Sequence, residues 1–309
     1  MLQSKTPDTA ALGSPFVSVV VPLFTHSSRV WDCLQHLSRQ TYDVHCYEVI
    51  LVNNTGAPLT FPRLENLTLR IVDEARQGSY AARNQGVAHG RGSVVAFTDA
   101  DCLPAPEWIE RGVAKLLSAP HFGLIGGRID VRCADPDRPT PVELYEIACS
   151  FRQQEYVDRW RFAATANAFT FRRVFDEVHG FDPDLFSLGD REWARRVVQA
   201  GHTVGYADDA PVSHPSRRTF RELAARTSRI TGGFYRLTVQ HRWPLRVLAA
   251  DAWLGLAPRR RLFCRAPAAA DRPLTLHERI TVGTVCGFVV AVRVAELVRL
   301  AVGGRPVRS

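Results

Sequence analysis

The chain has 309 residues and a mass of 34.5 kDa, enough for one large domain with an extension or for two small domains. Hydrophobic residues make up 46% and charged residues 23%, which excludes a disordered chain, a collagen-like chain and a protein with many membrane spans. The net charge is +8, but residues 1–220 hold a net of −3 and residues 221–309 a net of +11. The C-terminal part is therefore expected to meet an anionic surface, either lipid or nucleic acid, unless its many arginines only reflect the codon bias of a GC-rich genome.

Cysteine usage and the first residues bear on the compartment. The seven cysteines are an odd number, and no two are spaced as C-x-x-C. Neither a disulfide framework nor a zinc site is expected, and reduced thiols in the cytosol are the default. Residues 1–16 contain no apolar run of signal-peptide length, so we expect a protein that is not secreted.

The predicted elements alternate between strands and helices from residue 16 onward. Residues 1–15 are polar and small, which is typical of a flexible arm. Runs of β-branched residues predict buried strands, and apolar residues at helical spacing predict helices. The strands are expected at 16–22, 47–52, 67–72 and 93–98, and the helices at 28–40, 79–89 and 106–118. This alternation is typical of an α/β fold with a mostly parallel sheet.

The pattern is less regular after residues 123–131. Helices are expected at 142–157 and 190–200, and short strands at 166–171 and 203–206. From residue 220 the chain is expected to be helical and basic. We therefore divide the chain into an arm at 1–15, an α/β domain at 16–220 and a basic helical extension at 221–309.

Three short segments follow predicted strands, namely 22–25, Asn53 and Asn54, and 99–101. Ligands of open α/β sheets bind at the carboxyl ends of the strands, so these residues are expected at one rim. Asp99 and Asp101 flank one small residue, and strand alternation would place both carboxylates on the same side. Such oxygen ligands suit Mg²⁺ or Mn²⁺, although a solvated turn explains the pair as well.

A second group of signals surrounds the predicted helix at 79–89. Gly78 precedes a helix start, whose free N–H groups can bind an anion. Arg83 adds a guanidinium that can hold a phosphate or a base edge. The alternative is that Gly78 only ends a loop and that Arg83 is a surface charge.

Three further residues are open to two interpretations each. Asp190, at a predicted helix start, either accepts a proton from an acceptor hydroxyl or caps the helix. Glu192 either binds the acceptor or pairs with Arg195 or Arg196. His214 either supplies an imidazole to the same cation or is structural.

Seven short motifs, taken in chain order, resemble those of family 2 glycosyltransferases of the inverting, bacterial type with the GT-A fold. They are V-S-V-V-V-P, E-V-I-L-V-N-N, G-S-Y-A-A-R-N-Q-G, A-F-T-D-A-D, A-T-A-N-A-F, G-D-R-E-W-A-R-R and V-S-H. The resemblance spans residues 16–215, about two thirds of the chain. It implies a catalytic domain at 16–220 with a mostly parallel sheet flanked by helices.

The resemblance also implies roles for single residues. The segment from Pro22 to Thr25, together with Asn53 and Asn54, would hold the nucleoside of a nucleotide-diphospho-sugar. Arg83 would lie near the nucleotide, and Ala166 and Asn167 would line the sugar and acceptor pocket. Asp101 would bind the metal, His214 would complete metal or diphosphate binding, and Asp99 would touch the ribose or belong to the metal's shell. Asp190 would be the general base.

Three departures from the family pattern affect these roles. Asn53 stands where the family often has the Asp that reads the base, which leaves the nucleotide base open. Gly189 stands where the family often has Glu, so the surroundings of Asp190 are less acidic. Phe24 and Thr25 replace the usual aromatic-Asn pair.

The function implied is a metal-dependent direct displacement with inversion at the anomeric carbon. The expected partners are a nucleotide-diphospho-sugar donor and a glycan or lipid-linked acceptor in polysaccharide or cell-envelope glycan synthesis. The alternatives are an inactive sugar-nucleotide-binding relative and a nucleotidyltransferase, which would show a Gly-rich signature and a Lys after the first strand. A nucleic-acid-binding module would need a basic core, and the core nets −3.

The extension has three interpretations. Residues 280–292 carry no charge, and Trp243 and Trp253 precede Arg259, Arg260 and Arg261, a pattern that suits a membrane interface. The extension either packs on the catalytic domain, associates peripherally with a membrane, or spans it at 280–302, which would bury Arg293, Glu296 and Arg299. The expected location is the cytoplasm, with the inner face of the cytoplasmic membrane as the peripheral site.

Overall fold

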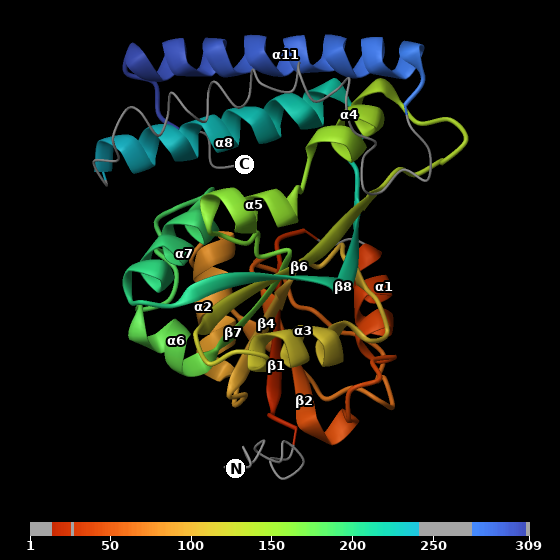
Figure 1. The fold of residues 1–309 in the computed structure, drawn as a ribbon, viewed down its shortest axis with the longest axis vertical. Helices are drawn as coiled ribbons and strands as arrows, with labels where there is room; N and C mark the ends of the chain where they lie inside the picture. Colours follow the sequence, from red (N-terminus) through yellow and green to blue (C-terminus); the bar gives the residue numbers. More distant parts are fainter. Residues whose placement is uncertain (1–13, 26–27, 241–273, 307–309) are drawn as a thin grey trace, which may run out of the picture.

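The computed structural model describes residues 14–25, 28–240 and 274–306. The arm predicted at 1–15 lies almost wholly outside these residues, as do Trp243, Trp253 and the arginines at 259–261. Figure 1 shows an α/β body with a layer of helices stacked on one side of it, away from the N-terminal end.

The described residues form an eight-stranded sheet of order β3-β2-β1-β4-β7-β6-β8-β5. The strands are β1 (Val17–Leu23), β2 (Tyr47–Asn53), β3 (Leu69–Asp73), β4 (Val94–Thr98), β5 (Leu103–Pro104), β6 (Phe122–Arg132), β7 (Asn167–Phe171) and β8 (Thr203–Pro215). The first four strands are mutually parallel, β7 runs antiparallel to both neighbours, and β8 is parallel to β6. The predicted α/β fold with a mostly parallel sheet is confirmed.

Two strands differ from their predicted extent. β8 continues to Pro215, far beyond the predicted 203–206, because its second half pairs with the end of β6 after a register shift. β6 was not predicted as a strand, since Gly126 and Gly127 interrupt its apolar pattern. A Cβ at Gly127 would lie 2.4 Å from the Asn167 side chain, so the glycine permits a close approach between β6 and β7.

The helices are α1 (Arg29–Leu37), α2 (Ser79–His89), α3 (Trp108–Leu117), α4 (Pro141–Cys149), α5 (Gln153–Trp160), α6 (Arg172–Glu177), α7 (Gly189–Gln199), α8 (Phe220–Gln240) and α11 (Leu276–Ala301), with a short 3₁₀ turn at Val44–Cys46. The single helix predicted at 142–157 is wrong. Phe151 has a φ of 48°, a left-handed conformation that ends α4 and lets the chain restart as α5.

Helices cover both faces of the sheet. α1 and α3 pack on one face through residues such as Leu34 and Trp108. α2, α6 and α7 pack on the other, where Phe97 of β4 lies against the rings of Phe181 and Trp193. Apolar strands buried on both faces carry little alternation, which is why β1 and β2 read as continuous hydrophobic runs.

The third layer consists of α4, α8 and α11, which share an apolar cluster containing Val142, Leu223, Val285 and Val289. Glu146 of α4 is fully buried beneath it and pairs with Arg217 at 2.9 Å and Arg226 at 3.7 Å. Burial alone would raise the pKa of Glu146, but the two arginines outweigh it and the net shift is downward. An ionised Glu146 therefore fixes the layer to the strand end at Pro215.

Candidate active site

Asp99 and Asp101 lie in a tight turn directly after β4. The Cys102 N–H donates to the Asp99 carbonyl oxygen at 3.0 Å, which closes the turn, and the Cys33 thiol of α1 contacts the same oxygen at 3.6 Å. The two carboxylates therefore converge because the chain turns, and not because an extended strand alternates. Their ligand atoms, with those of Cys102 and His214, all lie within 4.8 Å of one another.

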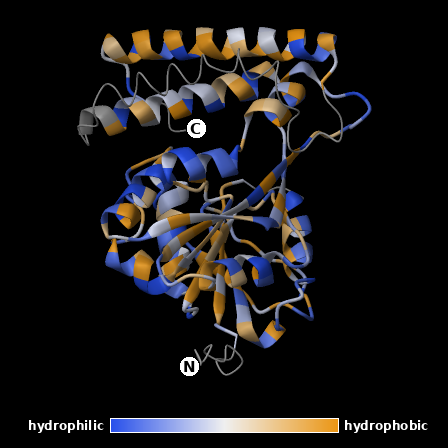
Figure 2. Cartoon of the chain, viewed as in Figure 1, coloured by the Kyte–Doolittle hydropathy of each residue, from blue (hydrophilic) through white to orange (hydrophobic). Residues whose placement is uncertain are grey.

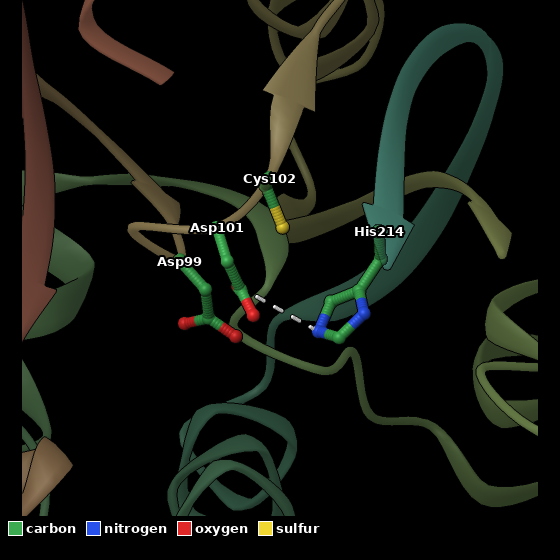
Figure 3. Close-up of side chains that lie close together, drawn as sticks. All are labelled: Asp99, Asp101, Cys102 and His214. Atoms are coloured by element: carbon green, nitrogen blue, oxygen red, sulfur yellow. Dashed lines mark ion pairs between the residues drawn. The ribbon is translucent and has the colours of Figure 1, made fainter. Parts of the chain in front are cut away.

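His214 reaches this turn from near the end of β8. Its Nε2 lies 3.9 Å from an Asp101 carboxylate oxygen, and Figure 3 shows the Asp101 carboxylate between that of Asp99 and the imidazole. The Nδ1 of His214 lies 2.8 Å from the Pro215 carbonyl oxygen, which can only accept a hydrogen bond. A neutral ring is therefore protonated on Nδ1, and its Nε2 lone pair points toward Asp101.

This set of donors fits a hard divalent cation. Two carboxylates and one imidazole converge, and 38% of the Asp101 side chain remains exposed, which leaves a side open to phosphate oxygens. Burial raises the pKa of Asp101, with Asp99 acting in the same direction and His214 opposing. Burial also raises the pKa of the Cys102 thiol, so Cys102 forms a neutral wall of the site.

Arg83 and Tyr80 connect the acidic turn to Asp190. They lie three residues apart on α2 and therefore share one face of the helix. Arg83 is buried and its Nη2 lies 2.5 Å from an Asp99 oxygen, while its guanidinium lies 5.8 Å from the centre of the Tyr80 ring. The Tyr80 hydroxyl in turn donates to an Asp190 oxygen at 3.4 Å. Arg83 is thus not a surface charge.

Asp190 lies in the first turn of α7 and does not cap it. The residue at the cap position is Leu188, and the Asp190 carboxylate accepts from the Arg191 N–H at 2.9 Å. Burial raises the pKa of Asp190, while that N–H, Arg83 and Tyr80 act in the opposite direction. A carboxylate with a raised pKa and few partners is suited to accepting a proton.

Gly189 has a structural explanation in this conformation. A Cβ at this position would lie 2.5 Å from the Tyr80 ring. The phenol therefore occupies the place that a side chain at 189 would take. Glu192 pairs with Arg196 at 2.7 Å, and Arg196 also donates to carbonyl oxygens at Val178 and Gly180. Of the two interpretations of Glu192, the structure therefore shows the ion pair.

Asn53 and Asn54 sit at the end of β2, at the predicted edge of the sheet. Asn53 donates to Asp73 at 2.6 Å and to the Ala57 carbonyl oxygen, and it accepts from Thr55. Asn54 donates to carbonyl oxygens of the following loop and accepts from the Gly78 N–H at 3.0 Å. Asn53 therefore joins the loop after β2 to the end of β3, Asn54 fixes the loop between β3 and α2, and both side chains are already engaged.

Three other predicted residues occupy different settings. Pro22 is buried within β1, which continues to Leu23. The pairing of β1 with β4 ends at Val20, so the missing N–H of Pro22 interrupts no hydrogen bond to β4. Thr25 is exposed beyond the strand. Asn167 is fully buried, donates to two carbonyl oxygens and accepts from the Trp108 indole, which leaves its amide nothing to offer a ligand in this conformation.

The sequence analysis missed Tyr80, Cys102 and Phe151. Tyr80 stood inside the quoted motif G-S-Y-A-A-R-N-Q-G, three residues before Arg83, and that helical spacing was a usable signal. The Phe151 ring packs on His214 at 4.3 Å between centroids, and no local pattern in the sequence indicated this contact.

Fold and site together define a glycosyltransferase. The family model described as glycosyl transferase family 2 matches residues 18–179, just over half of the chain, and the chain belongs to that family. A mannosyltransferase from Pyrobaculum calidifontis, solved in complex with GDP-Man and Mn²⁺, aligns with a TM-score of 0.54 at 18% identity over 94% of this chain and 76% of that one. The predicted GT-A fold is confirmed.

Two curated relatives give the degree of similarity. Glycosyltransferase AglE of Haloferax volcanii is 34% identical over 248 residues, which cover 78% of this chain and 80% of the relative. A pre-mycofactocin glycosyltransferase of Mycobacterium tuberculosis is 27% identical over 170 residues, 53% of this chain but only 36% of the relative.

Proposed function

We propose that the chain is a metal-dependent inverting glycosyltransferase that uses a nucleotide-diphospho-sugar. The observation that supports this most is the link through α2: Arg83 contacts Asp99, and Tyr80 contacts Asp190. One rigid helix thus spaces an acidic turn that could bind a cation from a half-buried carboxylate that can act as a base. An inactive sugar-nucleotide-binding protein would have no use for this second carboxylate.

The donor half of the proposed site consists of Asp101 and His214 as cation ligands, with Asp99 alongside. Arg83 already neutralises Asp99, which leaves Asp101 as the main anionic ligand. A bound Mg²⁺ or Mn²⁺ would supply Lewis-acid stabilisation of the diphosphate leaving group. The solved mannosyltransferase is described with GDP-Man and Mn²⁺, which is consistent with this chemistry.

The nucleoside would lie along the carboxyl ends of β1 and β2, near Thr25 and the loop that Asn53 and Asn54 hold. Because both asparagine side chains are engaged within the protein, we propose that they shape the nucleoside pocket and that backbone groups contact the base. Asp73 is exposed and accepts a hydrogen bond from Asn53, so an acidic side chain lies in direct contact with this pair.

The acceptor half is centred on Asp190. Its carboxylate would take the proton of an acceptor hydroxyl while that oxygen attacks the anomeric carbon opposite the diphosphate. One base and no covalent intermediate give inversion. We propose an acceptor in polysaccharide or cell-envelope glycan synthesis, at the cytoplasmic side of the membrane.

A panel of nucleoside diphosphates and nucleotide sugars, each with and without Mn²⁺, tests the donor half by thermal unfolding. A ligand at about 100 times its dissociation constant stabilises the fold by about 2.7 kcal/mol. We expect a clear, Mn²⁺-dependent rise in Tm for one base. A folded sample that responds to no nucleotide would contradict the proposal, and a product with retained anomeric configuration by NMR would contradict the inverting mechanism.

A further inference from the structure

The outer side of α11 carries no charged residue along its whole length. Figure 2 shows hydrophobic residues recurring from one end of this helix to the other. The exposed positions of α11 and the residue after it are Leu276, His277, Ile280, Gly283, Thr284, Gly287, Ala291, Val294, Ala295, Leu297, Val298, Ala301 and Val302. We call this set the outer face. A helix bordering water normally has the opposite distribution, with its charges outward.

The charged residues of α11 lie on its flanks or its inner side. Glu296 is only 6% exposed, on the inner side with Val285 and Val289. It is held by Arg299 at 2.6 Å. Arg279 and Arg293 are half-buried. The helix therefore keeps its carboxylate toward the protein and presents Ile280, Val294 and Val298 to the surroundings, each 54–60% exposed.

α11 is long and apolar enough to cross a membrane, and only 22% of its most apolar window is buried. Its packing argues against a crossing. α11 runs beside α8 in Figure 1 and packs on it as well as on α4. α8 carries Arg221, Arg226, Arg229 and Arg236, which hydrocarbon would not accept. A helix tied along its length to such a neighbour lies parallel to a membrane plane.

We propose that the outer face of α11 docks on an anionic lipid surface, with the helix in the interfacial plane. The apolar side chains would enter the boundary between head groups and acyl chains. Residues 221–309 carry a net charge of +11, which anionic head groups attract. The same charge opposes docking of a second copy of this chain on the same face, because both partners would be strongly basic.

This orientation places the proposed site toward the membrane. His214 packs on Phe151, and the Arg226 guanidinium of α8 lies 5.8 Å from the Phe151 ring centre. The helices α8 and α11 therefore lie between the site and the lipid. At 8–10 Å per helix, the two helices separate the site from the lipid by about 20 Å. If the proposed sugar transfer is correct, the acceptor that fits is a membrane-anchored one whose reactive hydroxyl stands about this far from the bilayer.

Vesicle flotation of the full chain tests the docking. The vesicles are phosphatidylcholine alone or phosphatidylcholine with about one third phosphatidylglycerol, in buffer with a chelator and no nucleotide. The variant is the triple substitution Ile280→Gln, Val294→Gln and Val298→Gln. The matched control is Leu117→Gln at the end of α3, since Leu117 is 53% exposed and lies on the catalytic body.

Wild type and the Leu117 control are expected to float with the anionic vesicles and more weakly with neutral ones. The triple variant should lose at least about tenfold in binding while keeping its Tm. Binding equal to wild type would overturn the proposal. The proposal would also be overturned if wild type did not bind vesicles, whether it stays monomeric in sedimentation or forms a dimer that the triple substitution dissociates. Because no donor or metal is present, these outcomes are independent of the proposed catalysis.

Discussion

Asp101 and Asp190 are both half-buried carboxylates whose pKa is raised mainly by burial, but their neighbours differ. Asp101 lies beside a second carboxylate and faces an imidazole, so it belongs to a cluster of candidate cation ligands. Asp190 lies outside that cluster, and its carboxylate accepts hydrogen bonds from a backbone N–H and from one phenol. The comparison shows how neighbours, and not residue type, separate a candidate cation ligand from a candidate proton acceptor.

Removing the charge of Asp190 should give the largest effect. Asp190→Asn is expected to lower kcat by about 10³-fold, within the range for a general base, and to leave Mn²⁺-dependent nucleotide binding unchanged. Because its pKa is raised in the folded state, the ionised form of Asp190 destabilises the fold above that pKa. Asn should therefore raise Tm at neutral pH, a gain that fades as pH falls and the wild-type carboxylate becomes protonated.

Turnover rates and calorimetric melts over a pH series check both parts. A variant with a wild-type kcat would remove Asp190 from the mechanism. A loss of nucleotide binding would instead assign it to the donor half.

Removing the charge of Asp101 should act on the opposite half. Asp101→Asn is expected to weaken nucleotide binding in the presence of Mn²⁺ by at least about 100-fold, because loss of a ligand should cost no less than loss of an outer-shell partner. The control is wild type in the presence of a chelator, and its nucleotide affinity should match that of the variant. Titration calorimetry measures both; an affinity that still rises with Mn²⁺ as in wild type would refute the metal assignment.

A smaller change sharpens the contrast by altering only the surroundings of Asp190. Tyr80→Phe removes a hydrogen bond to the charged carboxylate, so the pKa of Asp190 should rise further. The bond is long, at 3.4 Å, and we expect the acid limb of the kcat profile to move upward by roughly half a pH unit.

Tyr42→Phe is the control for Tyr80, because the Tyr42 hydroxyl donates to the Pro15 carbonyl oxygen, away from the site. Its pH profile should match that of wild type. A Tyr80→Phe enzyme that is slower at every pH, with an unmoved limb, would mean that the phenol only packs.

Much of the fold could be predicted because each local pattern had one dominant cause. The strands from β1 to β4 lie between two helical layers, so continuous apolar runs identified them. The break at Phe151 and the strand β6 were missed. A left-handed conformation at a residue other than glycine and a strand interrupted by glycines both depend on distant partners.

The site could be predicted as a set of acids but not as a network. Strand ends brought Asp99 and Asp101 to one edge as expected, but a turn and not alternation aligns them. The amides of Asn53 and Asn54 were expected to face a nucleoside, and whether they contact one stays a prediction. Their bonds to Asp73 at the end of β3 and to the Glu74 carbonyl oxygen involve residues 20 positions away, which a local motif does not reveal.

The close approach of Gly189 to the Tyr80 ring has a consequence for how this chain can change over evolution. With the Cβ position only 2.5 Å from the phenol, any side chain at 189 clashes while Tyr80 is present. The glutamate that the family often carries there is accessible only after position 80 has become smaller. The two positions form an ordered mutational path, so related sequences should vary at 80 and 189 together, with the change at 80 coming first.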